Sequence, residues 1–359
     1  MSSIKILQGN CLDRLKDLPE KSVNTCVTSP PYWGLRDYGT GEWVGGDPDC
    51  NHEGTVLGNN RNFVDREGRG SNNKSISSGD CYKCGATKKD DQLGLEETPE
   101  KFVENLVNVF REVRRVLRDD GTVWLNLGDS YSSGGRKTTT NQSLRGNNEY
   151  GVTRPKPSNG IKEKDLIGIP WRVAFALQAD GWYLRQDIIW SKPNPMPESV
   201  TDRCTKAHEY IFLLSNSPKY YYDNQAIKEP TSGQSGGGFS KKYAENQPCH
   251  GAMKLDRPKD TGFKNKLSVW SVPVSSYSEA HFSTYPPELI KPCILAGCPE
   301  GGTVLDPFGG SGTTAQVSNN LNRNAILCEL NPKYVEIAKG RLHDSLGMFL
   351  DLTVETPIN

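Results

Sequence analysis

Long apolar segments are missing from this sequence, in which 35% of the 359 residues are hydrophobic. No uninterrupted apolar run approaches the ~18 residues that a membrane-spanning helix needs. The opening residues, MSSIKILQGN, also lack the basic and then apolar pattern of a leader peptide. We therefore expect no membrane association and a soluble, cytoplasmic protein. The 36 glycines and 23 prolines predict long loops around a compact core.

An excess of either charge is also absent. The 43 acidic and 43 basic residues balance, so the chain as a whole gives no electrostatic signal for nucleic acid. A local signal is present in residues 236–266, a glycine-rich stretch that carries seven basic and three acidic residues. Such a run fits either a solvated surface loop or a contact with a polyanion.

A disulfide framework is not expected from the ten cysteines, because no secretion signal accompanies them. Two pairs have metal-ligand spacing: Cys50-x-His52 and Cys81-x2-Cys84, the second followed by Gly85. A tight Cys-x2-Cys turn presents two thiolates to one tetrahedral zinc ion. The four residues therefore predict a structural zinc site. The alternative is four ordinary side chains in a polar loop.

Short apolar strands alternate with helices along most of the chain, and no internal repeat is present. The predicted strands span 4–7, 23–28, 122–127, 183–190, 210–214, 303–305 and 325–328. The predicted helices span 100–118, 166–179, 287–295, 313–320 and 332–342. This alternation predicts an α/β fold, a mostly parallel sheet with helices on both faces. The stretches that interrupt it are 34–95, 132–164 and 228–275.

The stretch TSPPYW, residues 28–33, closes the strand predicted at 23–28. Two consecutive prolines cannot continue a strand ladder, so the backbone leaves the sheet there in a rigid, extended turn. Taken alone, the stretch fits a stiff strand exit with aromatic rings packed behind it as well as it fits a functional turn.

A glycine-rich turn, DPFGGSGTT at residues 306–314, joins the strand predicted at 303–305 to the helix that follows. Glycines at such a turn let the backbone approach a ligand, and the helix N-terminus offers unpaired N–H groups. A phosphate-binding loop would end in Gly-Lys-Ser/Thr, and this turn has no lysine. Glu329 follows Asp306 by 23 residues, at the end of the next strand, where dinucleotide-binding folds hold a ribose.

With TSPPYW near its start and DPFGGSGT near its end, the sequence resembles the DNA amino-methyltransferases with the permuted, beta order of motifs. Further stretches that resemble family segments are QGNCLDRLKDLPEKSVNTCVTSPPY, FREVRRVLRDDGTVWLNLGDSY, IPWRVAFALQADGWYLRQDIIWSKPNPMPES, HEYIFLLSNSPKYYYD and HFSTYPPELI. The resemblance implies a Rossmann-like fold with a circularly permuted motif order. It also implies an S-adenosylmethionine-dependent enzyme that methylates an exocyclic amine of a base in double-stranded DNA.

The resemblance assigns catalysis to Ser29, Pro30, Pro31 and Tyr32. An exocyclic amine is a poor nucleophile and is stacked in the duplex, so the base must be flipped out before the reaction. By resemblance, the Ser29 hydroxyl and the Pro30 carbonyl accept hydrogen bonds from the amine, and Tyr32 stacks on the base. At this motif Tyr32 follows Pro31, where enzymes that methylate cytosine carbon carry a Pro-Cys nucleophile, so direct transfer without a covalent enzyme intermediate is predicted.

The resemblance also assigns binding residues. The positions matched to the cofactor, S-adenosyl-L-methionine, are Asn10, Cys11, Thr284, Asp306, Pro307, Phe308, Gly309, Gly310, Gly312, Thr313, Glu329 and Asn331. The positions matched to the substrate DNA are Trp33, Lys192, Asn194 and Pro195. Two positions depart from the family, which more often has aspartate where this chain has Asn10 and lysine where it has Tyr285.

Ser29 favours cytosine N4 as the methyl acceptor, because adenine N6 enzymes of the family mostly carry aspartate at that position. Adenine N6 is the alternative. An alternative of another class is that the chain is a non-catalytic, zinc-containing nucleic-acid-binding protein on a degenerate methyltransferase fold. Detection of cofactor-dependent methylation would exclude this alternative. Methylation of RNA or glutamine is disfavoured, because those relatives usually carry Asn-Pro-Pro-Tyr after the cofactor loop.

The resemblance and the polar interruptions together divide the chain into a catalytic domain and three further segments. The catalytic domain is expected at 1–33, 96–227 and 276–345, an insertion with the zinc site at 34–95, a target-recognition region at 228–275 and a C-terminal tail at 346–359. A cognate restriction endonuclease is one candidate partner, in a prokaryotic or phage-infected cell. Both a monomer and a homodimer fit the sequence.

Overall fold

A nine-stranded sheet runs through the computed structural model, which describes residues 2–35, 37–52, 81, 83–132, 161–231, 262–274, 285–347 and 351–357. The strands of this sheet are β1 Ser3–Gln8, β2 Val23–Thr28, β5 Leu117–Leu127, β6 Tyr183–Ser191, β7 His208–Ser215, β10 Val269–Ser271, β11 Thr303–Asp306, β12 Asn324–Glu329 and β13 Asp351–Glu355. They lie in the order β10-β6-β7-β5-β2-β11-β12-β1-β13. Neighbouring strands are parallel except for β7, which is antiparallel to β5 and β6.

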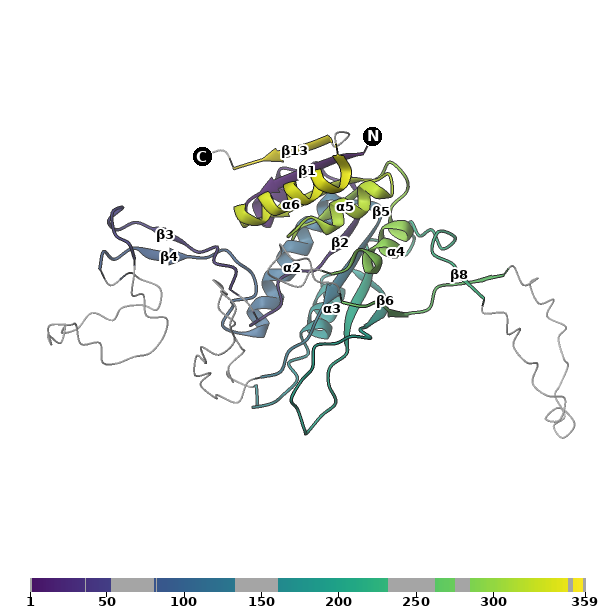
Figure 1. The fold of residues 1–359 in the computed structure, drawn as a ribbon, viewed down its shortest axis with the longest axis horizontal. Coiled ribbons are helices and arrows are strands. Elements are labelled where there is room, and N and C mark those ends of the chain that lie inside the picture. Colours follow the sequence, from purple (N-terminus) through teal and green to yellow (C-terminus); the bar gives the residue numbers. More distant parts are fainter. Residues whose placement is uncertain are drawn as a thin grey trace, which may run out of the picture.

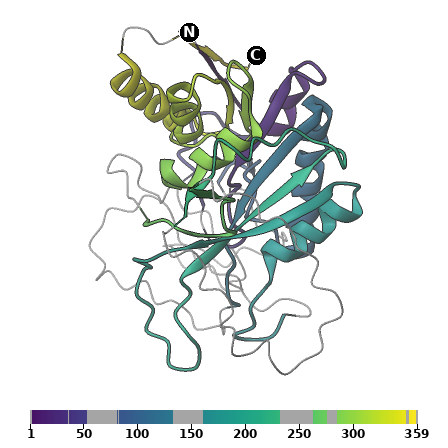
Figure 2. The same ribbon diagram turned by 90° about the vertical axis from the view of Figure 1, so that its right-hand side faces the viewer.

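Helices cover both faces of this sheet, as Figure 2 shows. The helices are α1 Cys11–Lys16, α2 Pro99–Val116, α3 Ile169–Ala179, α4 Pro287–Gly297, α5 Thr313–Asn320 and α6 Pro332–Leu346. Successive side chains of a strand point to opposite faces. Accordingly Cys26 of β2 packs in the core that α1, α2 and α3 share, and Val27 packs in the core under α4. The α/β fold expected from the sequence is confirmed.

Helix α2 shows how the sequence sets one of these elements. The Thr98 hydroxyl caps it by accepting a 3.2 Å hydrogen bond from Lys101 N, and Pro99 occupies the first turn, where a missing N–H costs nothing. Most of its apolar face is buried on the sheet, and Val103 is partly buried. The helix ends at Val116, two residues before the predicted end, because Leu117 is already extended and begins β5.

Two strands of the nine-stranded sheet come from stretches that the sequence placed outside the catalytic domain. β10 lies within the predicted target-recognition region and pairs with β6 at one end of the sheet. β13 lies in the predicted C-terminal tail and pairs with β1 at the other end. Helix α3 begins at Ile169 rather than 166, since the preceding Gly168 has a φ of +77°. Strand β5 begins at Leu117 rather than 122, and α6 ends at Leu346 rather than 342. The remaining predicted strands and helices lie within two residues of their observed bounds.

Two small antiparallel ribbons stand outside the main sheet. β3 Glu42–Val44 pairs with β4 Thr87–Lys89, and β8 Glu229–Pro230 pairs with β9 Phe263–Lys264. The β3–β4 ribbon belongs to the predicted insertion and projects away from the body of the molecule in Figure 1. Within the described residues, every helix is too short or too polar to cross a membrane.

Candidate active site and metal-ligating cluster

The sheet brings the two sequence motifs together at one edge. β2 and β11 are adjacent and parallel, so TSPPYW and DPFGGSGTT both leave the sheet at its carboxyl edge. The motifs also touch: Thr28 Oγ1 donates a 2.6 Å hydrogen bond to Asp306 Oδ1. β12 follows β11 in the sheet and ends at Glu329. The parallel order therefore gathers the predicted catalytic and cofactor-binding segments in one place.

Asp306 is the buried centre of the glycine-rich turn and is 1% exposed. Besides Thr28, its carboxylate accepts hydrogen bonds from the Tyr285 hydroxyl (2.8 Å), Thr314 Oγ1 (2.6 Å) and Phe308 N (3.0 Å). Burial raises the pKa of this carboxyl above its ordinary value even though these donors oppose the shift. Both carboxylate oxygens are engaged within the protein, so Asp306 shapes the turn that a ligand would meet.

The glycines of the turn differ in what surrounds them. A Cβ on Gly309 would lie 2.8 Å from Leu327 Cβ, so this glycine lets the turn pack against β12. Gly312, with φ +81°, would bring a Cβ to 3.1 Å from Ala338 Cβ in α6. A Cβ on Gly310, with φ +51°, would meet only Phe308 O, at 3.9 Å. The turn therefore has room for a ligand at Gly310.

Glu329 lies beside this open side. Its Oε2 accepts a 2.8 Å hydrogen bond from Gly310 N, and its Oε1 accepts one of 2.8 Å from Asn331 N. Burial raises the pKa of Glu329 to about 7. A carboxylate at the end of a parallel strand, next to a glycine turn and the N-terminus of α5, fits the ribose of an adenosyl cofactor. The residues present therefore fit S-adenosyl-L-methionine.

A polar network surrounds the catalytic turn. Asn126 Oδ1 in β5 accepts hydrogen bonds from Ser29 Oγ and from the Tyr32 hydroxyl, both at 3.2 Å. The Tyr32 hydroxyl also donates to Glu209 Oε2 at 2.6 Å, and Asn126 Nδ2 donates to the same oxygen at 3.3 Å. Burial and the neighbouring Glu209 hold the pKa of Tyr32 well above its ordinary value. A Cβ on Gly128 would lie 2.5 Å from the Tyr32 ring, so that ring packs directly on the end of β5.

Two lysines approach this network from the segment between β6 and β7. Lys192 forms an ion pair with Glu209 Oε1, and its ammonium lies 4.3 Å from the centre of the Trp190 ring. The Lys206 ammonium is buried without a hydrogen-bond partner among the described residues, and this burial lowers its pKa. Glu209 therefore links Lys192 to Tyr32 of the catalytic turn, since it contacts both side chains.

The other residues assigned to the cofactor mostly hold the local fold. Asn10 Oδ1 caps α1 by accepting a 2.9 Å hydrogen bond from Leu12 N, and burial raises the pKa of the Cys11 thiol to about 12. Asn331 caps α6, and Thr313 Oγ1 accepts a 2.8 Å bond from Arg341. Pro307 lies in the turn with Phe308. Thr284 lies outside the described residues.

One residue assigned to DNA is placed differently by the structure. Trp33 is 4% exposed, packs in the core with α2, and donates a 2.8 Å hydrogen bond from Nε1 to Glu96 O. Its ring is used for packing, and the contact with DNA expected for Trp33 stays a prediction. Asn194 exchanges hydrogen bonds of 2.8 and 3.1 Å with the backbone of Val274, and the half-buried Pro195 follows it.

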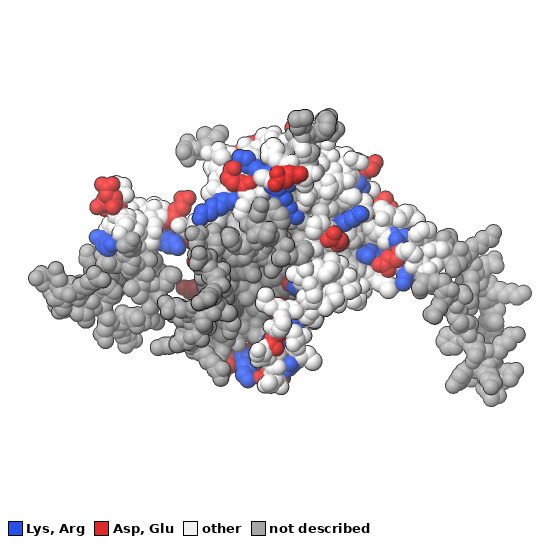
Figure 3. All heavy atoms as spheres, viewed as in Figure 1, with Lys and Arg blue, Asp and Glu red and all other residues white. Residues whose placement is uncertain are grey.

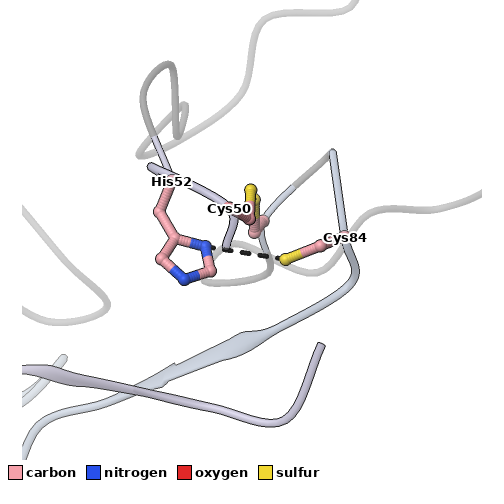
Figure 4. A group of neighbouring side chains, drawn as sticks. Cys50, His52 and Cys84 are labelled. Carbon is pink, nitrogen blue, oxygen red and sulfur yellow. Dashed lines mark hydrogen bonds between the residues drawn. The ribbon is translucent and has the colours of Figure 1, made fainter. Parts of the chain in front are cut away.

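The four metal-ligand candidates of the insertion lie together. Ligand atoms of Cys50, His52, Cys81 and Cys84 all fall within 4.8 Å of one another. Cys50 Sγ lies 3.8 Å from Cys81 Sγ, and Cys84 Sγ lies 3.6 Å from His52 Nδ1, the contact drawn in Figure 4. Three sulfurs and an imidazole nitrogen form a donor set typical of tetrahedral zinc. The residues predicted from their spacing are therefore brought together.

The local backbone supports this cluster. Cys81 N donates to Ala86 O at 2.6 Å and Gly85 N donates to Cys81 O at 2.8 Å, which closes the Cys-x2-Cys-Gly turn. A Cβ on Gly46 would lie 2.8 Å from Cys84 Sγ, so glycine makes room for that sulfur. The His52 ring stacks on Trp43 of β3, with centroids 4.7 Å apart. The cluster thus ties the two sides of the β3–β4 ribbon.

Residues that sequence reasoning missed complete the site. Asn126 and Glu209 lie on β5 and β7, which the sequence marked only as core strands, and Tyr285 was noted only as a departure from the family. A signal was available: polar residues within otherwise apolar strands, in WLNLGD and HEYIF, require buried hydrogen-bond partners.

Comparisons with known proteins agree with this geometry. A family model described as DNA methylase, for the N6/N4 methyltransferases, matches residues 23–340. The chain is 40% identical over 343 residues to the type II methyltransferase M.Cfr9I of Citrobacter freundii, covering 95% of this chain and 88% of the relative. It is 40% identical to the type II methyltransferase M.SmaI of Serratia marcescens, covering 95% and 91%.

Solved structures show the same fold. A putative DNA modification methylase from Thermus thermophilus, complexed with S-adenosyl-L-methionine, has a TM-score of 0.55 and 21% identity, covering 99% of both chains. The PvuII DNA methyltransferase (cytosine-N4-specific) has a TM-score of 0.54 and 16% identity, covering 95% and 86%. The resemblance found in the sequence and the Rossmann-like methyltransferase fold are confirmed. The chain belongs to the N6/N4 DNA methylase family and is an S-adenosylmethionine-dependent DNA methyltransferase.

Proposed function

We propose that this methyltransferase transfers a methyl group to the N4 amine of a cytosine flipped out of double-stranded DNA. The main support is the hydrogen bond from Ser29 Oγ to Asn126 Oδ1. Because Asn126 takes the hydroxyl proton, the lone pairs of Ser29 remain to accept from an amine. The neutral hydroxyl is also the side chain that the family mostly uses for cytosine N4.

The chain's own residues have separate tasks in this proposal. S-adenosyl-L-methionine, when bound, supplies an electrophilic methyl group. Glu329 would accept hydrogen bonds from the ribose hydroxyls, and the open side of Gly310 would leave room for the cofactor. Ser29 and the Pro30 carbonyl would direct the lone pair of the amine, and Tyr32, on a rigid di-proline turn, would stack on the flipped base.

The identity of the methylated base is tested by nucleoside analysis. Unmodified DNA is incubated with the enzyme and cofactor, digested to nucleosides, and separated by chromatography with mass detection. We expect N4-methyldeoxycytidine, which has the mass of 5-methyldeoxycytidine but a different retention time. N6-methyldeoxyadenosine in its place would reject the cytosine assignment and leave amine methylation intact. A Ser29→Ala variant serves as the negative control.

Sequence recognition is proposed to use the region 228–275 and the insertion 34–95. On the face shown in Figure 3, acidic and basic side chains of the described residues are interspersed and form no extended basic patch. Five of the seven basic residues in the run 236–266 lie outside the described residues. Lys264 and Lys266 lie within them, and Lys266 pairs with Glu229 at 2.9 Å. The balanced charge is consistent with a contact confined to a few segments.

The insertion is proposed to hold one structural zinc ion through Cys50, His52, Cys81 and Cys84. A closed set of four protein ligands leaves no open position for substrate, so the ion would stabilise the insertion and take no part in methyl transfer. Elemental analysis of protein purified without chelators should find about one zinc per chain. The Cys81→Ser/Cys84→Ser variant should lose it, and Cys204→Ser, at an exposed cysteine, should retain it. Wild-type protein without stoichiometric metal would reject this site.

The cellular setting follows from the substrate. We place the activity in the cytoplasm of a prokaryotic cell or of a phage-infected host, where DNA is accessible. The relatives M.Cfr9I and M.SmaI are named type II methyltransferases, so a restriction endonuclease with the same recognition sequence is the proposed partner system. Single-molecule sequencing of DNA from cells that express the protein would report that sequence.

A further inference from the structure

We propose that Tyr38, at the start of the insertion, forms one wall of the cofactor site and contacts the adenosyl part of S-adenosyl-L-methionine. This inference rests on the proposed role of Glu329 and the Gly310 turn. It extends the site to a segment that neither motif includes. The observations that carry it are the contacts of Tyr38 with α6 and with the second half of the insertion.

Tyr38 lies at the N-terminus of α6. Its carbonyl accepts a 3.2 Å hydrogen bond from Asn331 Nδ2, and its ring meets the Tyr334 ring edge to face, with centroids 6.3 Å apart. Asn331 in turn donates its backbone N–H to Glu329 Oε1 at 2.8 Å. One side chain therefore separates Tyr38 from the carboxylate that is proposed to hold the ribose.

The two ends of the insertion hold Tyr38 in place. Gln92, which is 8% exposed, accepts a 2.6 Å hydrogen bond from Tyr38 N through Oε1. Asp90 Oδ1 accepts bonds from Thr40 Oγ1 (2.7 Å) and Gln92 N (3.0 Å). These bonds clamp residues 38–40 to residues 90–92. Between the clamped ends lie the β3–β4 ribbon and the Cys/His cluster.

The same end of the insertion supports the catalytic turn. Gly34 N donates to Gly94 O at 2.8 Å, and a Cβ on Gly94 would lie 3.0 Å from Tyr32 O. Tyr38 is also near enough to Tyr32 to contribute to the raised pKa of that phenol. The insertion therefore joins the cofactor half of the site to the catalytic half, and Tyr38 lies at the junction.

The chemistry of tyrosine suits this position. A half-buried aromatic ring gives a purine a flat apolar surface at little entropic cost, and its packing on Tyr334 already fixes its orientation. Stacking of a base on an aromatic ring accepts any base, so the ring would add affinity for the adenine without adding selectivity. Glu329 would supply the polar contact and Tyr38 the apolar one.

Calorimetric titration of S-adenosyl-L-methionine into the full-length protein tests the proposal. Tyr38→Ala should raise the Kd about tenfold, as expected for the loss of one aromatic contact with a base. Tyr183→Ala is the control. It removes an exposed tyrosine at the first position of β6 and should leave the Kd within twofold of wild type. An unchanged Kd for Tyr38→Ala in protein that melts like wild type would overturn the proposal. Tyr38→Phe should bind like wild type, because the contact is made by the ring.

A double-mutant cycle tests whether the Cys/His cluster affects cofactor binding through Tyr38 or through a general effect on folding. If the cluster positions Tyr38, Cys81→Ser/Cys84→Ser should weaken cofactor binding in the wild-type background and add little in the Tyr38→Ala background. Fully additive effects would show that the cluster acts elsewhere and would reject the coupling between the insertion and Tyr38. Failure of the proposed cofactor role of Glu329 is distinguishable, because Glu329→Gln would then leave the Kd unchanged whatever the effect of Tyr38→Ala.

Discussion

Asn126 illustrates at the scale of single residues how a neutral side chain sets the direction of a reactive one. Its amide oxygen accepts from both Ser29 and Tyr32, and its amide nitrogen donates to Glu209. An aspartate at position 29 would need no such partner, because a carboxylate only accepts. A serine can both donate and accept, so its proton must be held away from the incoming amine. The network around Ser29 meets this requirement.

The first prediction concerns Ser29. Ser29→Ala should lower kcat by ~100-fold or more, the usual effect of removing one oriented polar group from a reacting centre, and leave the Kd for S-adenosyl-L-methionine nearly unchanged. The reason is that the Ser29 hydroxyl bonds to Asn126, whereas the proposed cofactor contacts are made by Glu329 and the glycine turn. Ser22→Ala, which removes an exposed hydroxyl that donates to Pro19 O, is the control. Turnover within a few-fold of wild type would contradict the catalytic role of Ser29.

The second prediction concerns Glu329, whose pKa is raised to about 7 by burial. The ionised carboxylate is the better acceptor for ribose hydroxyls, so cofactor affinity should rise as the pH increases through 7. Stability of the free protein should change in the opposite sense. The folded pKa lies above the ordinary value of 4.5, so the folded state binds more protons and loses stability between pH 4.5 and 7.

Glu329→Gln provides the measurement for this prediction. The variant should bind the cofactor more weakly at pH 8, lose the pH dependence of the Kd between 6 and 8, and show a flatter dependence of its melting temperature on pH. The pH range from 6 to 8 is chosen because it brackets the pKa of Glu329, which burial raises to about 7. A wild-type Kd that is constant over this range would argue against an ionised Glu329 as the ribose ligand.

At the scale of elements, sequence reasoning identified the helices and strands with a strong apolar periodicity. It missed the strands that form only by pairing with a neighbouring strand. Helix α5 and strand β2 lie at their predicted bounds, because glycine, proline and the apolar pattern mark their ends. The end of α2 was placed too late, since Leu117 continues the helical spacing of apolar residues although its backbone is extended. β10 and β13 are short strands whose reason to form is the neighbouring strand, which the local sequence does not reveal.

The candidate site was predictable to a similar degree. Parallel strands bring their carboxyl ends to one edge, which the predicted alternation implies, but the adjacency of β2 and β11 that brings TSPPYW to DPFGGSGTT is seen only in the structure. Asn126 and Glu209 were not predictable as partners, because they lie on strands whose adjacency to β2 appears only in three dimensions. The burial of Trp33 was not predictable, because an aromatic ring after a catalytic turn and an aromatic ring in the core look alike in sequence.

The third prediction separates the glycines of the turn. Gly309→Ala should lower the melting temperature, because its Cβ would lie 2.8 Å from Leu327 Cβ in β12. In Gly310→Ala the Cβ would meet only Phe308 O, at an ordinary contact distance of 3.9 Å, so its main cost is the φ of +51°, which for a non-glycine residue is of order 1 kcal/mol. If the cofactor occupies the open side of Gly310, Gly310→Ala should raise its Kd more than it lowers stability. The prediction would be contradicted if the two glycine variants showed the same ratio between the rise in Kd for the cofactor and the fall in melting temperature.

At the scale of the whole molecule, one sheet joins segments from both ends of the chain. β1 and β13 pair in parallel, and Lys5 forms a 2.8 Å ion pair with Glu355 across them. Glu355 also accepts from Arg14 in α1, the helix that Asn10 caps at the end of β1. Strand β13 therefore protects the edge of β1 and reaches toward the cofactor side of the molecule.

The last prediction tests whether β13 is part of the fold. Val354 is half-buried and packs with Leu352 against the core of β1, β12 and α6, and Thr353 between them is exposed. Val354→Asp should lower the melting temperature by several degrees, because a carboxylate placed against that core loses hydration without gaining a partner. Thr353→Asp puts the same charge on the same strand but on its exposed side, so it should melt within about a degree of wild type. If the two variants have the same melting temperature, β13 contributes no packing, and the stretch after α6 behaves as the tail that the sequence predicted.

A second outcome concerns the edge of the sheet. If only Val354→Asp is destabilised and it also promotes aggregation, β13 protects the β1 edge, since unpaired strand edges are the common route to association between chains.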